Sequence, residues 1–404
     1  MVDVDRAPVQ DWTADYDIFD LGYVNDPYGI WAEIRAQCPI ARTDRWGGSW
    51  MPVTYEQVTA MARDIDSFPS GNGVAVVPPL QQEDGQAPLL ANGLPPISAD
   101  PPVHTWSRRL ILPSMAPRRV EEYEVMTREL CRHLLDGFAD AGRADAAADY
   151  AQQIPVRVIA HLLGIPPEMS DTFTGWVRDV LEFAYDADRR RGGIVAIATY
   201  LREQIADRRQ NPKGDLLTEL VHTEIAGEPV DESYIIGIAA LLLIAGIDTT
   251  WSAIGSSLWH LASHPDDRRR LVAEPELLPT AVEEFLRAYS PVTMARVLDH
   301  DVEYHGCPMK SGDRILMNFP AANRDPSVFD NPDEVVIDRQ HNRHVAFGAG
   351  IHRCAGSNLA RMELRVAIEE WLARIPEFEL EDPQLVTWAG GQVRGPRNIP
   401  VVFD

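Results

Sequence analysis

The chain has 404 residues, 45% of them hydrophobic, so it can bury a sizeable core and is not expected to be disordered. Its 37 basic and 61 acidic residues give a net charge of −24, which disfavours binding to nucleic acids or to anionic membrane surfaces. The cysteines (Cys38, Cys131, Cys307 and Cys354) are too widely spaced for a disulfide framework and suit a reducing cytoplasm.

The N-terminal residues lack the basic start and the apolar run of a signal peptide. The longest apolar stretch, residues 235–247, is far shorter than the roughly 20 residues of a membrane span and predicts a buried core helix. We therefore expect a cytoplasmic protein with no membrane partner. No repeat and no Gly/Ser-rich linker divides the chain, which predicts a single domain over residues 1–404.

Helical periodicity dominates the sequence. It predicts helices over residues 118–140, 148–163, 194–209, 214–225, 232–263, 277–289 and 355–373. Short β-like segments occur at residues 50–53, 299–303 and 314–319 and at the C-terminal end. Two irregular segments, residues 69–102 and 326–346, have a length typical of ligand-covering or disordered loops. The fold class predicted is mostly α with a small β component.

The first candidate site in chain order is the segment of residues 100–109. His104 and Arg108 are four residues apart, so on a helix they point the same way. Two cationic donors on one face suit a pair of carboxylates. A solvated basic face would give the same pattern.

An acid and a hydroxyl interrupt the apolar helix predicted over residues 232–263. Asp248 and Thr249 follow Ala245 and Gly246, whose small size would let a flat ligand pack closely. A carboxylate in an apolar helix is costly unless it is satisfied or used. Thr249 could also bond to the carbonyl four residues earlier and open the helix locally, so a structural role is equally open.

Glu284 and Arg287 are three residues apart on the next predicted helix, which places them on one face. Taken alone, this spacing predicts only a surface ion pair, and such a pair contributes little to stability.

The most informative segment is a glycine-rich turn that leads into the last predicted helix and contains Cys354. Free N–H groups and the helix dipole at such a position stabilise a thiolate. Gly348, Gly350 and Gly356 permit unusual dihedral angles and close approach of a flat group. A thiolate in that setting suits an axial ligand of haem, and a buried structural cysteine is the alternative.

Zinc is a weaker interpretation of the same segment. His341, His344 and His352 lie near Cys354, but no second cysteine is close enough to complete the usual closed tetrahedron.

Residues 347–361 match the pattern F-G-x-G-x-H-x-C-x-G-x-x-L-A-R, which resembles the haem-binding signature of the cytochrome P-450 family. The three segments described above match that family in order and spacing, so the resemblance covers nearly the whole chain. It implies the family's fold, a triangular helical prism with haem b between the long central helix and the helix after the cysteine. It also implies a haem-thiolate monooxygenase with O2 as co-substrate.

By this resemblance Cys354 would be the axial iron ligand, Thr249 would hydrogen-bond the O2 being activated, and Asp248 would relay protons. The two haem propionates would be bound by His104, Arg108, Arg296 and His352. Further haem contacts would come from Ala245, Phe347, Gly348 and Gly356. Glu284, Arg287 and Arg339 would form the family's buried structural network. Trp106 departs from the pattern, because many relatives carry a basic residue there.

The resemblance also places the substrate pocket. Its walls would come from residues 74–94, 176–185, 238–245, 292–294 and 391–393, and the residues chosen are Val74, Leu242, Ala245, Val292, Thr293, Met294 and Val393. These side chains are mostly apolar, which predicts a small to medium hydrophobic substrate such as a terpenoid or aromatic compound. The expected reaction is hydroxylation, O-dealkylation or epoxidation.

The chain carries no flavin or iron–sulfur domain and no dinucleotide fingerprint. Electrons are therefore expected from a ferredoxin-type donor with its NAD(P)H-dependent reductase, serving a monomer. An acidic donor would dock on a basic patch made of Arg108, Arg109, Arg118, Arg119, Arg339, Arg343, Arg353, Arg361 and Arg365.

Three alternatives stay open at this point. One is a peroxide-driven haem-thiolate enzyme, although such relatives typically lack the Asp248/Thr249 pair. Another is a non-catalytic haem sensor or electron carrier, although carriers usually fill both axial positions and no second ligand is apparent on the apolar helix. The last is a dehydration or rearrangement on the same fold.

Overall fold

The computed structural model describes residues 7–38, 40–80 and 90–404. The α-helices are α1 (Leu21–Asn25), α2 (Tyr28–Gln37), α3 (Tyr55–Arg63), α4 (Val103–Ile111), α5 (Pro117–Asp136), α6 (Gln153–Leu163), α7 (Ser170–Leu181), α8 (Ala187–Gln210), α9 (Leu216–Val221), α10 (Glu232–Ser263), α11 (Pro265–Ala273), α12 (Leu278–Ala288), α13 (Phe319–Ala322) and α14 (Ser357–Arg374). The strands are β1 (Ile40–Thr43), β2 (Ser49–Pro52), β3 (Arg143–Asp145), β4 (Glu224–Ile225), β5 (Glu228–Pro229), β6 (Thr293–Val297), β7 (Val302–Tyr304), β8 (Cys307–Met309), β9 (Arg314–Asn318), β10 (Phe378–Leu380), β11 (Thr387–Ala389), β12 (Gly395–Asn398) and β13 (Pro400–Phe403).

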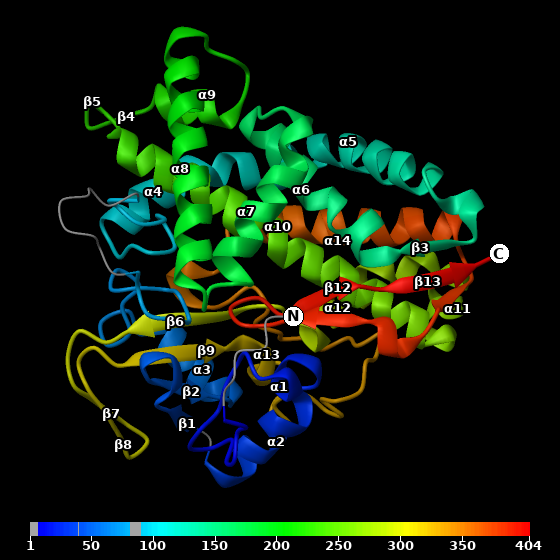
Figure 1. Cartoon of the computed structure of the whole chain (residues 1–404), viewed down its shortest axis with the longest axis horizontal. Helices are drawn as coiled ribbons and strands as arrows, with labels where there is room; N and C mark the ends of the chain where they lie inside the picture. The colour runs from blue at the N-terminus through cyan, green and yellow to red at the C-terminus, as the bar shows by residue number, and fades with distance from the viewer. Residues whose placement is uncertain (1–6, 39, 81–89) are drawn as a thin grey trace.

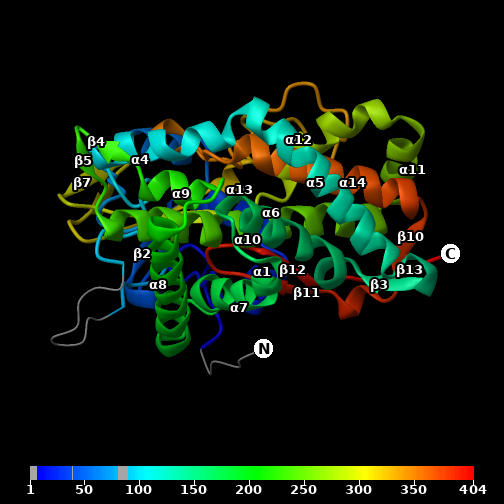
Figure 2. The same ribbon diagram turned by 90° about the horizontal axis from the view of Figure 1, so that it is seen from above.

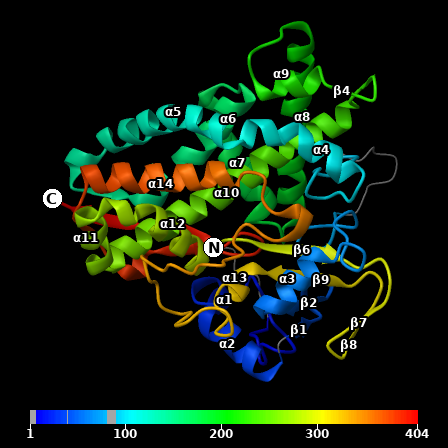
Figure 3. The same ribbon diagram turned by 180° about the vertical axis from the view of Figure 1, so that it is seen from behind.

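The helix α10 forms the centre of the molecule. Asp231 caps its N-terminus by accepting a hydrogen bond from the Ser233 N–H at 2.9 Å. Among the described helices, only α10 is long and apolar enough to cross a membrane. However, 83% of its apolar stretch is buried inside the protein. It is therefore a core helix, and α6, α7, α8 and α14 pack against it. Figures 1 and 3 show α5, α14 and α10 running side by side, and Figure 2 shows α7 and α8 together beside α10.

The sheets are small, and the largest lies at one end of the helical part, whereas β3 and β13 lie at the other (Figure 1). The largest has the strand order β1-β2-β9-β6. Its strands β2 and β9 are parallel, whereas β6 and β9 are antiparallel and pair Arg296 with Ile315. Every residue of β9 is buried, so this strand forms the middle of the sheet. The sheet holds β6, and with it Arg296, beside the cavity described below.

The expected fold class is confirmed, and each predicted helix corresponds to an observed one. The prediction over residues 148–163 is wrong in one respect, because a π-helix over Ala146–Ala151 precedes α6. Pro155 lies in the first turn of α6, where its missing N–H costs no helical hydrogen bond.

The structure also contains elements that the periodicity did not predict. The helix α7 carries weak helix formers such as Thr174 and Gly175, but it buries Phe173, Val177 and Leu181 at helical spacing. The predicted strand over residues 299–303 is wrong at its start, because residues 299–301 lie outside the strands, between β6 and β7. The described parts of the two irregular segments contain no helix or strand, as expected.

Candidate active site

The loop before α14 holds Cys354 by backbone hydrogen bonds. The Cys354 N–H donates to the Phe347 carbonyl at 2.8 Å, and the Gly348 N–H donates to the Val345 carbonyl at 2.9 Å. Gly348 and Gly350 adopt φ of +72° and +70°, as their predicted role requires. A Cβ at Gly350 would lie 2.7 Å from the carbonyl oxygen of Ala62 on α3, so this loop and α3 approach closely only because the residue is glycine.

Gly356 does not have the unusual dihedral angles expected of it, because its φ is −82°. Its N–H donates to the sulfur of Cys354 instead. Burial raises the pKa of the Cys354 thiol, and the Gly356 N–H together with the charges of Arg108, Arg353 and Arg361 opposes that rise. The helix terminus alone therefore does not produce the expected thiolate. A coordinated metal ion would, because coordination removes the thiol proton outright.

The opposite wall of the site is the middle of α10. Thr249 Oγ1 donates to the Ala245 carbonyl at 2.7 Å, which is the bond expected from the sequence, but the helix remains continuous. Ala245 is exposed although most of α10 is buried, because it borders a cavity. Gly246 also lets α6 pack closely against α10, because a Cβ at this position would lie 2.6 Å from Ile159 Cδ1 on α6.

Asp248 points away from that cavity, although it follows Gly246 and Ile247 in the same helix. Its Oδ1 accepts a hydrogen bond from Arg397 Nη2 at 2.7 Å, and Arg397 also donates to Glu182 at 3.0 Å and to Ser252 at 3.2 Å. Burial raises the pKa of Asp248, and the charge of Arg397 opposes this rise. The second carboxylate oxygen is buried and has no hydrogen-bond partner in the described part of the chain.

A cluster of basic side chains borders the cavity on a third side, and its positive charge comes from two arginines. Arg108, Arg296 and His352 all line it. Arg296 is 4% exposed and donates only to the Ala295 carbonyl, and burial lowers its pKa to about 10. Burial and the neighbouring cations lower the pKa of His352 to about 3.

The acidic side chain close to this cluster is Asp100, whose Oδ1 lies 3.9 Å from His352 Nε2. Asp100 already accepts hydrogen bonds from the Ser70 and Gly71 N–H groups. The cluster therefore has an excess of positive charge, which fits two added carboxylates.

His104 does not reach the cavity wall. Its Nε2 bonds to the Ile351 carbonyl at 3.1 Å, and its ring packs on that of His352 at a centroid distance of 4.6 Å. Both contacts are with the loop that carries Cys354, so His104 supports the loop, and Arg108 does the same by donating to the Arg353 carbonyl at 2.6 Å.

The cavity between these walls has a volume of about 350 Å³. It is lined by Cys354, Thr249 and the predicted contacts Phe347, Gly348 and Gly356, and by the predicted pocket residues Val74, Leu242, Ala245, Val292, Met294 and Val393. Thr293 is not part of the wall, because adjacent residues of a strand face opposite sides and Val292 and Met294 take the inner side. Residues 81–89, within the predicted wall 74–94, lie outside the described part of the chain.

Two charged lining residues were missed from the sequence, Glu363 and Arg190. Glu363 is 1% exposed, and burial raises its pKa well above the usual value for glutamate. The sequence pattern could have indicated that Glu363 is buried. It lies four residues after Leu359, within an apolar stripe that also contains Met362 and Val366. Arg190 lies in a run of three arginines on α8 that gave no such signal.

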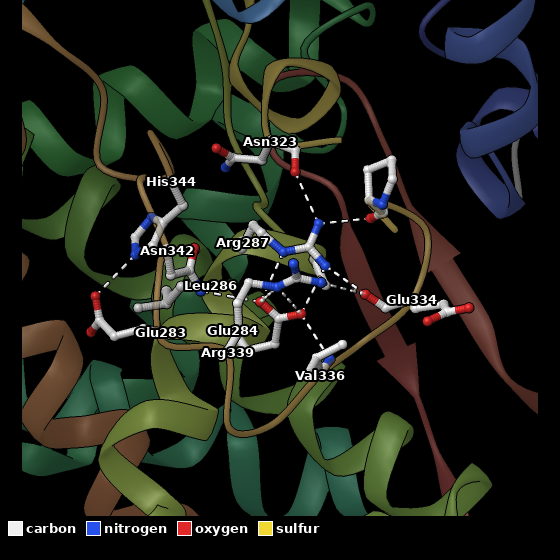
Figure 4. A network of polar contacts seen from close by, with 12 residues as sticks. Glu283, Glu284, Leu286, Arg287, Asn323, Glu334, Val336, Arg339, Asn342 and His344 are labelled. Carbon is white, nitrogen blue, oxygen red and sulfur yellow. Dashed lines mark hydrogen bonds and ion pairs between the residues drawn. The ribbon is translucent and has the colours of Figure 1, made fainter. Parts of the chain in front are cut away.

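The residues Glu284, Arg287 and Arg339 meet in one buried network (Figure 4). Arg287 donates from Nε and Nη2 to the two carboxylate oxygens of Glu284 at 2.8 Å each, and Arg339 Nε donates to Glu284 at 3.0 Å. The Val336 N–H and the Asn342 amide complete the set of donors to this carboxylate. Neither Glu284 nor Arg287 has any exposed side-chain surface.

Carboxylates neutralise part of the predicted basic patch. Several of its members form ion pairs: Arg119 with Glu122, Arg339 with Glu284, Arg361 with Glu283, and Arg365 with Glu124. Within the described residues, the exposed members without an ion pair are Arg109, Arg118, Arg343 and Arg353.

The zinc interpretation has no support in the described residues, which contain no group of three or more possible metal-ligating side chains. His344 Nε2 donates to Glu283 at 3.0 Å instead. A free thiol that faces a cavity rimmed by excess cations suits a flat, dianionic group that takes one axial ligand from the protein. These features define a haem-thiolate protein, and the residues present fit haem b.

Comparisons with known proteins agree with this class. The family model described as cytochrome P450 matches residues 186–387. The chain is 34% identical to mycinamicin IV hydroxylase/epoxidase of Micromonospora griseorubida, covering 94% of this chain and 97% of that protein. It is 35% identical to vitamin D(3) 25-hydroxylase of Pseudonocardia autotrophica, covering 97% of each.

A crystal structure of the myxobacterial cytochrome P450 CYP267B1 in complex with myristic acid superposes with a TM-score of 0.86, at 31% identity and with 96% of this chain and 98% of that chain covered. The chain belongs to the cytochrome P450 family. Members of this family are monooxygenases that bind haem b and use O2.

Proposed function

We propose that this chain hydroxylates a small to medium hydrophobic molecule, such as a terpenoid or aromatic compound. Epoxidation or O-dealkylation would proceed at the same site. In the hydroxylation, O2, two electrons and two protons convert a substrate C–H bond into C–OH and release one water. The observation that carries the proposal is that Cys354 and Thr249 line one largely apolar cavity.

The proposed roles follow from where each side chain lies. Cys354 would hold the haem iron, and Arg108, Arg296 and His352 would bind the propionates, with His104 positioning the loop. Bound haem supplies reductive activation of O2 and transfer of one oxygen atom to the substrate. Thr249 would hold and pass a proton at its hydroxyl oxygen, inside a cavity whose apolar walls exclude water.

Asp248 would deliver protons to that hydroxyl. Its carboxylate is engaged by Arg397, so delivery requires this ion pair to open toward the cavity. The presence of both Asp248 and Thr249 supports O2 and external electrons over peroxide as the source of oxidising power.

The substrate class is supported by the apolar side chains that α7, α10 and β6 contribute to the wall, such as Val180, Leu242 and Met294. The names of the relatives give different organic molecules: mycinamicin IV, vitamin D(3) and, in a crystal, myristic acid. A wall of aliphatic side chains suits such molecules by burial of apolar surface.

Electrons would come from a ferredoxin-type protein with an NAD(P)H-dependent reductase, and the chain would act in the cytoplasm as a monomer and a single domain. The free arginines Arg109, Arg118, Arg343 and Arg353 lie on α4, at the start of α5 and in the loop around Cys354. On a protein with a net charge of −24 they would form a local basic surface for an acidic partner.

The test is a cysteine substitution read by spectroscopy. Cys354→Ser should abolish the red-shifted Soret band of the reduced carbon monoxide complex, because that band requires an axial thiolate. The matched control is Cys307→Ser, which changes a half-buried cysteine on β8 and should keep the band. A band that persists in Cys354→Ser, or a wild-type protein that binds no haem, would overturn the proposal.

A further inference from the structure

One cation in the cavity wall comes from a helix that contributes none of the residues expected to bind the propionates. Arg190 enters the wall from α8, one helical turn before Ile194, which also lines the cavity. Arg108, Arg296 and His352 come from α4, β6 and the cysteine loop instead. The carboxylates of haem would account for the positive charge of Arg108 and Arg296, whereas the charge of Arg190 on α8 has no such explanation.

Arg190 has no acidic partner in the described part of the chain. Its Nη1 donates to the Pro78 carbonyl at 2.8 Å, and no other hydrogen bond of this guanidinium is found among the described residues. The preceding residue on α8 behaves differently, because Arg189 pairs with Asp179 at 2.6 Å. A guanidinium has five N–H donors, so most of the donor capacity of Arg190 is unused.

The surroundings of Arg190 add to its charge. Burial lowers the pKa of Arg190, and the charge of Arg314 on β9 lowers it further. Arg314 is itself buried, has no ion pair in the described residues, and carries a buried Nε without a partner. Arginine keeps its proton even so, because its pKa in water is above 12.

Such a cation is costly in an apolar cavity unless a ligand neutralises it. We propose that the substrate carries a carboxylate, which Arg190 binds while the apolar remainder of the molecule extends toward Thr249. This inference rests on the proposed function and narrows its substrate class to apolar organic acids, terpenoid or aromatic acids among them, oxidised at a carbon remote from the carboxylate.

Matched acids and esters test the inference. Dodecanoic acid, perillic acid and 4-isopropylbenzoic acid would each be compared with its methyl ester, which keeps the apolar body and removes the charge. Binding to the haem-loaded protein would be measured by the spin-state shift and by calorimetry. We expect the acids to bind roughly 10- to 100-fold more tightly than their esters, as a charge-assisted pair of hydrogen bonds provides.

Substitutions locate the effect. Arg190→Met should remove the preference for acids while leaving the affinity for the esters within about twofold, because only the charged contact is lost. Arg189→Met is the matched control, since it removes the same charge from the adjacent, exposed position, and it should keep the preference. Acids that bind no more tightly than esters, acids that do not bind at all, or a preference that survives Arg190→Met would each overturn the inference.

The outcome is separable from that of the proposed function. The Soret band of the reduced carbon monoxide complex and the oxidation of a bound methyl ester by the wild-type protein report the haem-thiolate chemistry independently of any preference for acids, and Arg190→Met should keep the band. Loss of the acid preference with these readouts intact is the expected result, whereas their loss in the wild-type protein would refute the proposed function itself.

Discussion

The buried carboxylate of Glu284 offers the most direct test of the energetics of this fold. The substitution Glu284→Gln keeps the shape of the side chain and removes its charge. Glu284 accepts hydrogen bonds from Arg287 at 2.8 Å, from Arg339 at 3.0 Å and from the Val336 N–H at 2.8 Å, all without solvent (Figure 4). The glutamine amide would turn donors toward donors and would leave two guanidinium groups without a counter-charge.

Breaking a buried ion pair by removing one partner costs about 3–5 kcal/mol, because the remaining charge stays buried. Arg287 retains its bonds to the carbonyls of Asn323, Pro332 and Glu334, which keeps the cost within this range. From the typical unfolding entropy per residue, a chain of 404 residues loses about 1.2 °C of Tm per kcal/mol. We therefore expect Tm to fall by about 4–6 °C.

The assay is unfolding of the haem-loaded protein, by heat and by guanidinium chloride, at pH 7. The control is Glu283→Gln at the adjacent position, where the carboxylate is 32% exposed and pairs with Arg361 and His344. Its loss should cost only about 1–2 kcal/mol, since solvent screens that pair. Equal costs for the two substitutions, or a cost below about 1 kcal/mol for Glu284→Gln, would refute the reasoning.

Three further predictions concern acid stability, coupling and docking. Burial alone would raise the pKa of Glu283, but Arg361 and His344 outweigh burial and lower this pKa from 4.5 to about 2. The contribution of Glu283 to folding stability is therefore present above pH 4.5 and is lost as the pH falls toward 2. The stability difference between wild type and Glu283→Gln should therefore shrink over that interval in acid-denaturation measurements, and a constant difference would contradict the assignment. Thr249→Ala should retain haem and substrate binding but divert electrons to hydrogen peroxide. Thr249→Ser should restore the coupling of electron use to product formation. An unchanged product yield per electron in Thr249→Ala would exclude the assigned role. Arg109→Gln combined with Arg343→Gln should raise the KM for a ferredoxin several-fold at low salt, whereas the control Arg143→Gln, on β3, should not. Turnover that does not slow with rising ionic strength would count against docking of the donor on the basic surface.

Sequence patterns predicted the elements whose signal is local. The helix over residues 232–263 was predicted with the bounds that α10 has, because a long apolar segment with an Asp cap leaves few alternatives. The turn around Gly348 and Gly350 was also predicted from its local sequence, because glycine adopts positive φ without steric cost.

Contacts between distant segments could not be predicted in this way. Asp248 and Arg397 are 149 residues apart, and nothing in either local pattern indicates that they meet. Arg361 was assigned to a docking surface as a free charge, whereas the fold uses it to neutralise Glu283. A charge count along the sequence contains no information on which opposite charge the fold brings near.

The division of charge between surface and interior explains why the occupants of the cavity should be anions. The chain as a whole carries −24, yet its buried carboxylates contribute little negative charge at the cavity. Asp248 is neutralised by Arg397, and burial raises the pKa of Glu363, which favours the uncharged form of its carboxyl group.

Arg108, Arg190 and Arg296 remain at the wall without an ion pair in the described residues. Burying a charge is offset only by an opposite charge at hydrogen-bonding distance, so these three cations favour ligands that bring their own carboxylates. Haem b brings two, and both suit the side of Arg108 and Arg296. The positive charge of Arg190 is then still unmatched, and a neutral hydrocarbon would leave it so, which is why affinity for an acid relative to its ester reports directly on the part of the cavity that haem does not fill.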